Sequence, residues 1–175
     1  MAQIFVQDYI RACMEMEKAV FSQQYEAPVL IYEHPRAGLS FNWGQTRLTA
    51  ETKQVPLTRD LIRNGHKLPV IALCKRVMGP PGQVRLGRSD ENDLVIPDET
   101  VSSRHAVFQE HRETGTYMLQ DLASMNGTQV NGSRMIVGKT VVLFDGDVLA
   151  FGDSVFLFFY PDGLYDVLKA NLDFL

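Results

Sequence analysis

The sequence predicts a mainly β protein whose larger part folds as an antiparallel sandwich or barrel. From residue 69 to residue 160, short β-branched and aromatic runs recur about every 8–12 positions, which is typical of strands in such folds. Glycine, asparagine and aspartate separate these runs, as expected for tight turns. The chain has 175 residues, 45% of them apolar and 22% charged, and this composition suits one globular domain with an appendage or two very small domains.

The first 68 residues differ from this pattern and predict an α/β extension. Residues 4–24 carry apolar side chains at helical spacing, and Pro28 ends the pattern. We predict a helix over about 4–24 that packs on its own protein. The alternative is a helix that docks on a partner or a second copy, so that the protein forms a homo-oligomer through this extension.

The rest of the extension contains shorter elements. Residues 29–32 and 39–43 have the composition of strands. Residues 57–64 follow Pro56 and end at Asn64, just before Gly65, which predicts a short helix. One helix and two short strands bury little surface, so we expect residues 1–68 to pack on a main domain formed by residues 69–175.

Within residues 69–175 the sequence predicts a series of strands followed by a helix. The dipeptides Asn131-Gly132 and Asp145-Gly146 are those that type I′ hairpin turns prefer. A short C-terminal helix is expected at residues 163–172, where it would cover one end of the sheets. The predicted strands are 70–74, 83–86, 94–96, 106–108, 116–119, 128–130, 140–144, 148–150 and 155–159.

Charge is unevenly distributed along the chain. Residues 1–82 hold 10 Lys/Arg and 7 Asp/Glu, whereas residues 83–175 hold 7 and 14. Nucleic-acid binding needs many cations, so the acidic half is not expected to bind it and must hold any anion with a few focused donors. The isolated cysteines Cys13 and Cys74, together with the lack of a long apolar run or signal peptide, indicate a cytoplasmic protein without membrane insertion.

The polar residues of greatest chemical interest lie in predicted loops of the acidic half. Arg88 offers a planar pair of donors that matches two oxygens of a phosphate, and the hydroxyls of Ser102 and Ser103 can satisfy the third. Asn126 has both a donor and an acceptor, which suits a grip on a peptide backbone. Gly87 is expected to let the chain turn so that Arg88 projects from the end of a strand.

These residues lie within motifs that resemble the forkhead-associated (FHA) domain. The similarity covers roughly residues 69–160, and its pieces follow the order and spacing of that family. The matching segments are residues 86–89, 92–96, 101–106, 119–122, 124–128, 130–132, 143–147 and 151–152.

The resemblance implies an FHA-like antiparallel β-sandwich that binds phosphothreonine peptides with its loops. It implies that Arg88 and Ser102 contact the phosphate and that Ser103 assists this contact through its side chain or backbone. Asn126 would bind the peptide main chain just after the phosphothreonine.

The resemblance also assigns supporting roles and exposes one departure. Gly87, His105 and Gly127 would support the site, with His105 bracing the loop that carries Ser102. Met125 stands where many members have threonine or a basic residue that also touches the phosphate. The missing hydroxyl removes one hydrogen bond, worth about 1 kcal/mol.

Structural roles are the alternatives for the same residues. Arg88 could pair with Asp90 or Asp93, and Ser102 and Ser103 could serve only as turn residues. The acidic run that starts at Asp90 lacks the glycine and final glutamate of an EF-hand loop, so no metal site is expected.

Enzyme activity is not expected. Ser102, His105 and Asp121 are the residue types of a catalytic triad, but the serine and histidine lie three positions apart in a turn. No nucleophile elbow, Walker loop or zinc-protease motif accompanies them, and no cofactor is predicted.

Two functions of different classes are consistent with the sequence. The first is a phosphothreonine-dependent adaptor in signal transduction, which acts downstream of a Ser/Thr protein kinase and binds a phosphothreonine-containing protein. The second is a phosphate-independent structural or assembly protein, for example in secretion or envelope machinery. A subordinate possibility is recognition of the chain's own phosphorylated threonines, namely Thr46, Thr49, Thr52 and Thr58.

Overall fold

A computed structural model describes residues 4–33 and 61–172, and the chain divides into two compact units. The first, here called the terminal unit, comprises Met1–Ala72 and Phe159–Leu175. The second, the central unit, is Leu73–Phe158. This division differs from the predicted one, because the C-terminal helix belongs with the N-terminal residues and not with the sandwich.

The terminal unit is built mainly from three helices, which are α1 (Val6–Glu15), α2 (Lys18–Gln24) and α4 (Pro161–Leu172). The single helix predicted over 4–24 is wrong, because the backbone is extended at Met16 and Glu17. The Met16 carbonyl accepts a hydrogen bond from the hydroxyl of Tyr165, 149 residues away. A tertiary contact therefore satisfies the carbonyl at the break, and no glycine or proline marks this position.

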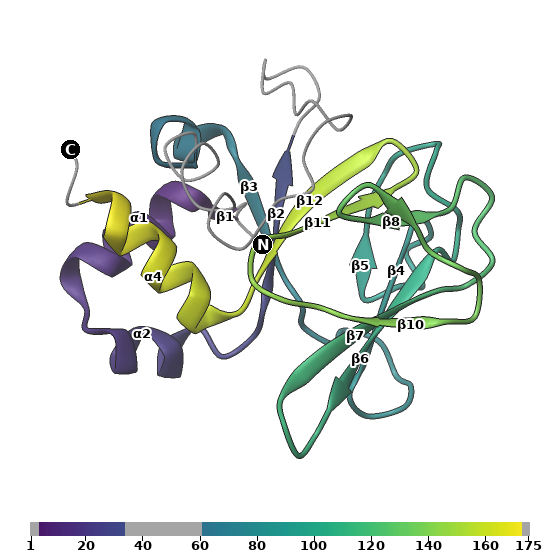
Figure 1. The fold of residues 1–175 in the computed structure, drawn as a ribbon, viewed down its shortest axis with the longest axis horizontal. Helices are drawn as coiled ribbons and strands as arrows, with labels where there is room; N and C mark the ends of the chain where they lie inside the picture. Colours follow the sequence, from purple (N-terminus) through teal and green to yellow (C-terminus); the bar gives the residue numbers. More distant parts are fainter. Residues whose placement is uncertain (1–3, 34–60, 173–175) are drawn as a thin grey trace. The chain divides into compact units, whose positions relative to one another are not determined.

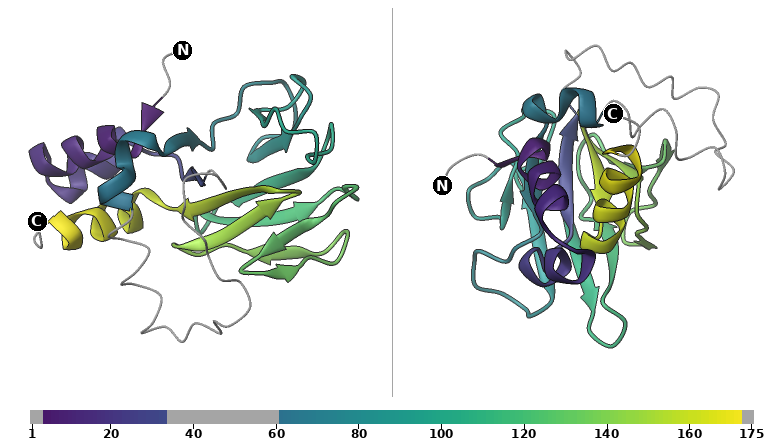
Figure 2. Two further views of the ribbon diagram at one scale, coloured as in Figure 1. Left: turned by 90° about the horizontal axis from the view of Figure 1, so that it is seen from above. Right: turned by 90° about the vertical axis from the view of Figure 1, so that its left-hand side faces the viewer.

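Aromatic packing joins these helices. Phe21 is fully buried, and its ring lies 4.7 Å from that of Tyr25, 5.3 Å from that of Tyr165 and 6.2 Å from that of Tyr9. Figure 2 shows α4 alongside α1 and α2, in agreement with these contacts. The predicted C-terminal helix is thus confirmed, but it packs on helices of its own unit.

Among its described residues, the terminal unit also contains strands in the order β1-β3-β2, which pair antiparallel. Their bounds are β1 Ile4–Phe5, β3 Pro69–Ala72 and β2 Val29–Glu33. Residues 61–64 are helical, as predicted, and a 3₁₀ turn follows at Gly65–Lys67. The strand predicted at 39–43, the start of the helix predicted at 57–64 and the four threonines of the self-recognition hypothesis lie outside the described residues.

The central unit confirms the predicted mainly β architecture. One sheet contains the order β12-β11-β8-β9, and a five-stranded sheet has the order β10-β7-β6-β4-β5. Figure 1 labels all of these strands except β9. All pairs are antiparallel except β4 with β5. The bounds are β4 Gln83–Gly87, β5 Leu94–Val95, β6 Ala106–His111, β7 Thr116–Asp121, β8 Thr128–Val130, β9 Ser133–Arg134, β10 Thr140–Val142, β11 Asp147–Phe151 and β12 Ser154–Phe159.

Alternating side chains from these strands form the core. Along β7 the residues at positions 117, 119 and 121 are buried while those between them are partly exposed, which is the two-residue period of a half-buried strand. Phe151 is fully buried and contacts the rings of Phe108 and Phe156.

The two predicted hairpin turns have different outcomes. Asn131 and Gly132 have φ values of 52° and 77° and connect the paired strands β8 and β9, as a type I′ turn requires. Asp145-Gly146 does not connect paired strands, because β10 pairs with β7 whereas β11 pairs with β8 and β12. It forms a turn closed by a hydrogen bond from the Asp147 N–H to the Phe144 carbonyl, so the hairpin prediction there is wrong.

Within residues 4–33 and 61–172, no helix combines the length and apolar character needed to cross a membrane.

Candidate functional site

Three loops of the central unit meet through hydrogen bonds, and they are called the site loops below. They are residues 88–93 between β4 and β5, residues 96–105 between β5 and β6, and residues 122–127 between β7 and β8. The Arg88 N–H donates to the Ser102 carbonyl at 3.0 Å, which joins the first loop to the second. The Met125 N–H donates to Ser102 Oγ at 2.9 Å, which joins the second to the third.

Arg88 projects from the end of β4 and is exposed. Its Nε–H donates to the Val101 carbonyl at 3.2 Å, which orients the guanidinium. The two terminal nitrogens have no hydrogen-bond partner among the residues that the structure describes. A fixed guanidinium with unused donors can bind an oxyanion through two parallel hydrogen bonds.

Gly87 is required at the end of β4 for a reason other than the predicted turn. Its φ lies outside the left-handed region, but a Cβ there would stand 2.3 Å from the Ser103 carbonyl oxygen and 2.8 Å from Asn92 Nδ2. The glycine therefore allows two site loops to approach each other closely.

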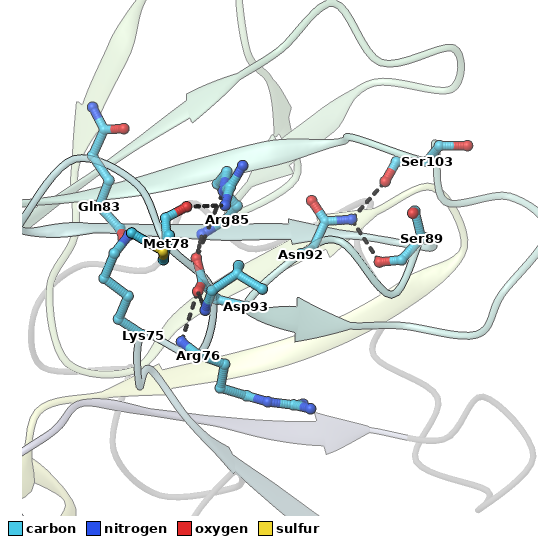
Figure 3. A network of polar contacts seen from close by, with 10 residues as sticks. Lys75, Arg76, Met78, Gln83, Arg85, Ser89, Asn92, Asp93 and Ser103 are labelled. Atoms are coloured by element: carbon cyan, nitrogen blue, oxygen red, sulfur yellow. Dashed lines mark hydrogen bonds and ion pairs between the residues drawn. The ribbon is translucent and has the colours of Figure 1, made fainter.

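Asn92 and Asp93 anchor the first loop through hydrogen bonds to neighbouring segments (Figure 3). The buried Asn92 amide donates to the carbonyls of Ser89, at 2.8 Å, and Ser103, at 2.6 Å. The fully buried Asp93 carboxylate accepts the N–H groups of Arg76, Val77 and Arg85 at 2.7–2.8 Å.

Asp93 is ionised despite its burial. Desolvation alone would raise its pKa, but the three backbone hydrogen bonds outweigh it, so the pKa of Asp93 lies below its ordinary value. Asp93 is also 3.8 Å from Arg85 Nε. These contacts do not include Arg88, so the alternative ion pair between Arg88 and Asp93 is not formed.

His105 is buried and braces the second and third loops. Its Nδ1 accepts the Ser102 N–H at 3.0 Å, so the proton of the neutral ring is on Nε2, which lies 3.2 Å from the Gly127 carbonyl oxygen. The ring also meets the Phe151 ring edge-on at 5.6 Å. Burial lowers the pKa of His105, and the Gly127 carbonyl and nearby Asp121 only partly offset that effect.

The third loop carries Asn126, whose side chain is exposed. Its Nδ2 donates to the Thr100 carbonyl at 2.8 Å, which turns Asn126 towards the second loop. The Asn126 side-chain oxygen has no partner among the described residues and can accept a hydrogen bond from a peptide N–H.

Two further carboxylates fix the ends of the second and third loops. Asp121 accepts the hydroxyls of Ser124 and Thr128, each at 2.6 Å, and these bonds outweigh burial and lower the pKa of Asp121. Asp98 accepts the hydroxyls of Ser154 at 2.6 Å and Thr100 at 2.8 Å, and these bonds lower the pKa of Asp98.

The structure brings Arg88, Ser102 and Asn126 together through this set of loop contacts. The Ser103 hydroxyl has no partner among the described residues, and its carbonyl serves the first loop. Met125 is 86% exposed, and its N–H is bound by Ser102 Oγ.

The sequence did not identify two groups that hold the site loops in place, which are the Thr100 carbonyl and the Asn92 side chain. The carbonyl of Thr100 could not be found from residue type, since every residue has one. Asn92 lies in the matching segment 92–96, but its bonds to two loop carbonyls depend on the folded chain. No group of His, Cys, Asp and Glu in the described part of the chain is arranged to hold a metal ion.

Comparison with known proteins gives a match to this region. The family model of the FHA domain matches residues 84–152, which include all three site loops. The ABC transporter ATP-binding/permease protein Rv1747 of Mycobacterium tuberculosis is 40% identical over 93 residues, covering 53% of this chain and 10% of that protein.

A second relative is the transcriptional regulatory protein EmbR of Mycobacterium tuberculosis, which is 40% identical over 75 residues, covering 42% of this chain and 18% of that protein. The solved structure of EmbR in complex with a low-affinity phosphopeptide has a TM-score of 0.41 and 34% identity, and the match covers 45% of this chain and 20% of that one. The chain thus spans less than a fifth of the length of each of these curated relatives.

Proposed function

Since the chain belongs to the FHA domain family through residues 84–152, we propose that it is a phosphothreonine-peptide-binding adaptor that acts downstream of a Ser/Thr protein kinase. Its partner would be a protein that carries a phosphothreonine. It would need no cofactor and would bind its partner without chemical change.

The meeting of Arg88, Ser102 and Asn126 carries this proposal. A phosphate has about 1.5 to 2 negative charges and three acceptor oxygens. The free terminal nitrogens of Arg88 suit two of these oxygens. Ser102 Oγ accepts the Met125 N–H, so its own hydroxyl proton remains available to the third oxygen.

Relatives and thiol chemistry add support. EmbR, which is 40% identical over 75 residues, has been solved with a phosphopeptide. Both cysteines are free thiols, and burial raises the pKa of Cys13 to about 12 although the charge of Lys169 opposes this. Free thiols suit a reducing compartment, and we propose that the protein acts in the cytoplasm.

The test is titration of the whole chain with a library of fluorescent phosphothreonine peptides and their unphosphorylated counterparts. We expect the phosphorylated peptides alone to bind, and Arg88→Ala to weaken binding about tenfold to hundredfold, because hydrogen bonds to a charged group are worth about 1.5–3 kcal/mol. Arg112→Ala, an exposed arginine beyond β6, is the matched control and should bind as wild type does.

Binding that is equal for phosphorylated and unphosphorylated peptides, or equal for wild type and Arg88→Ala, would overturn the proposal. Either result would favour a phosphate-independent scaffold. Thermal melting of each variant separates lost binding from lost folding.

A further inference from the structure

Arg134 is a second cation beside the site that neither the proposed phosphate contacts nor the structural contacts employ. It lies in β9, is exposed, and faces Gln129 of β8 in the sheet register. The type I′ turn at Asn131-Gly132 sets that register, so the position of Arg134 follows from the hairpin.

The Arg134 side chain lies directly over Gly127, the residue next to Asn126. A Cβ on Gly127 would stand 2.7 Å from Nη2 and 2.8 Å from both Cζ and Nε of Arg134. Three coplanar atoms at nearly equal distance mean that the guanidinium presents its flat face to the glycine. Its N–H donors lie in the plane of the group and therefore point along the surface, away from Gly127.

Gly127 is itself firmly held. Its carbonyl oxygen lies 3.2 Å from His105 Nε2 and accepts the Gly152 N–H at 3.3 Å. With φ at 83° it adopts a backbone conformation that favours glycine. Arg134 therefore rests on a fixed support, which reduces the entropy lost when its donors bind a ligand.

The charges of the site loops distinguish Arg134 from its neighbours. Arg88 faces the proposed phosphate position, and Arg104 is 3.4 Å from Glu91 in an ion pair. Arg134 has no ion pair with any acidic residue that the structure describes. The central unit carries eight Lys/Arg and eleven Asp/Glu, so Arg134, like Arg88, keeps an unpaired guanidinium in a unit that is acidic overall.

We propose that Arg134 is a specificity-determining residue that binds a carboxylate side chain of the partner peptide on the C-terminal side of its phosphothreonine. The inference rests on the proposed function. Asn126 is assigned to the peptide main chain just after the phosphothreonine, and Arg134 covers the next residue of the loop, so its donors lie where the following peptide side chains pass. A planar guanidinium matches a carboxylate through two hydrogen bonds.

The experiment uses phosphothreonine peptides with alanine flanks, in which one glutamate or one lysine is moved through the three positions on each side. Fluorescence anisotropy with the whole chain gives the ratio of the two dissociation constants at each position. We expect wild type to bind the glutamate peptide about fivefold more tightly than the lysine peptide at one position after the phosphothreonine, as befits an exposed ion pair.

Arg134→Gln removes the charge but keeps a flat polar group over Gly127, and it should abolish this glutamate preference while retaining binding of the alanine-flanked peptide. Arg134→Lys should keep a smaller preference, since the charge remains and the planar donor pair is lost. Arg112→Gln should behave as wild type does, because it removes an exposed arginine away from the site loops.

The outcomes separate the two proposals. If no phosphothreonine peptide binds wild type, the proposed function fails and the role of Arg134 fails with it. If the peptides bind and Arg88→Ala abolishes binding, but the glutamate preference is absent or persists in Arg134→Gln, only the assignment of Arg134 is overturned.

Discussion

The terminal and central units are stabilised by different kinds of buried group. Both have apolar cores, and in the terminal unit an aromatic cluster around Phe21 joins three helices. In contrast, all the buried Asn, Asp, His, Ser and Thr side chains of residues 4–33 and 61–172 lie in the central unit. They are Asn92, Asp93, His105, Asp121, Thr128, Asp147 and Ser154.

The difference follows from what each unit must hold in place. Helices satisfy most of their own backbone groups, so their packing needs few buried polar side chains, and the ion pair between Lys18 of α2 and Asp166 of α4 lies at the surface. The site loops have no regular backbone pairing, and their N–H and C=O groups need partners from side chains. Hydrogen bonds are directional, so the same groups that satisfy the loops also set the geometry of the binding residues.

The largest expected effect is the loss of stability when the aromatic cluster of the terminal unit is disrupted. Phe21→Ala removes a fully buried ring and leaves a cavity, which should lower the free energy of unfolding by about 3–5 kcal/mol. Urea unfolding followed by circular dichroism measures this. Val20→Ala is the control on the same helix, since Val20 is 51% exposed, and should change the free energy by less than about 0.5 kcal/mol. Equal effects of the two variants would contradict the assigned core.

A smaller loss of stability, combined with weaker peptide binding, is expected when the Asn92 side chain is removed. Asn92→Ala removes the side-chain donor from the carbonyls of Ser89 and Ser103, which keep only a backbone N–H each, and should lower the free energy of unfolding by about 1–3 kcal/mol. It should also weaken phosphothreonine-peptide binding, because the loop that starts at Arg88 loses its anchor. Calorimetric titration and urea unfolding measure the two effects.

Gln109→Ala is the control for Asn92→Ala. Gln109 donates to the carbonyls of Gly82 and Glu110, in the same unit but away from the site loops. It should lose about 1 kcal/mol of stability with no change in peptide affinity. If Asn92→Ala keeps full affinity at a temperature where it is folded, buried polar groups do not set the site geometry.

The smallest expected effect is a pH dependence of the free energy of unfolding, caused by His105. Its pKa is lowered by burial, so above a pH of about 6.5 the ring is neutral in the folded and unfolded states and the stability is complete. As the pH falls below about 6.5 towards the lowered pKa, only the unfolded chain binds a proton, and the free energy of unfolding falls by at most about 1.4 kcal/mol per pH unit.

Urea unfolding between about pH 7 and pH 5 measures this slope, and His105→Gln should reduce it. The buried carboxylates do not interfere. Asp93, Asp98 and Asp121 have lowered pKa values, so they stabilise the fold above the ordinary carboxylate pKa of about 3.9, and that contribution is lost only as the pH falls through their folded-state values. An unchanged slope in His105→Gln would show that His105 is not the group responsible.

The strands of the central unit could be predicted because their signal is local. Alternating burial along β7 and the Asn131-Gly132 turn follow from residues that are adjacent in sequence. The residues of the candidate site could be named for a related reason, since Arg88, Ser102 and Asn126 stand at fixed positions within the segments that resemble the FHA domain.

The rest depends on contacts between residues distant in sequence. The helix break at Met16 coincides with a hydrogen bond from Tyr165, and the pairing of β10 with β7 removes the hairpin expected at Asp145-Gly146. The role of Gly87 was predicted from backbone freedom, but the carbonyl that needs its space belongs to Ser103, sixteen positions later. No local pattern contains such information.

The hydrogen bond between Met125 and Ser102 also has a consequence for the order of folding. Arg88 and Ser102 are brought together by the pairing of β4 with β6, whereas Asn126 reaches Thr100 only after the chain has passed through β7 and turned into β8. Pairings between nearby segments close smaller loops and form at a lower entropic cost. We therefore expect the complete site to form late, when β8 pairs with β11, and a nascent chain that ends before β8 to carry the proposed phosphate donors without the proposed peptide grip.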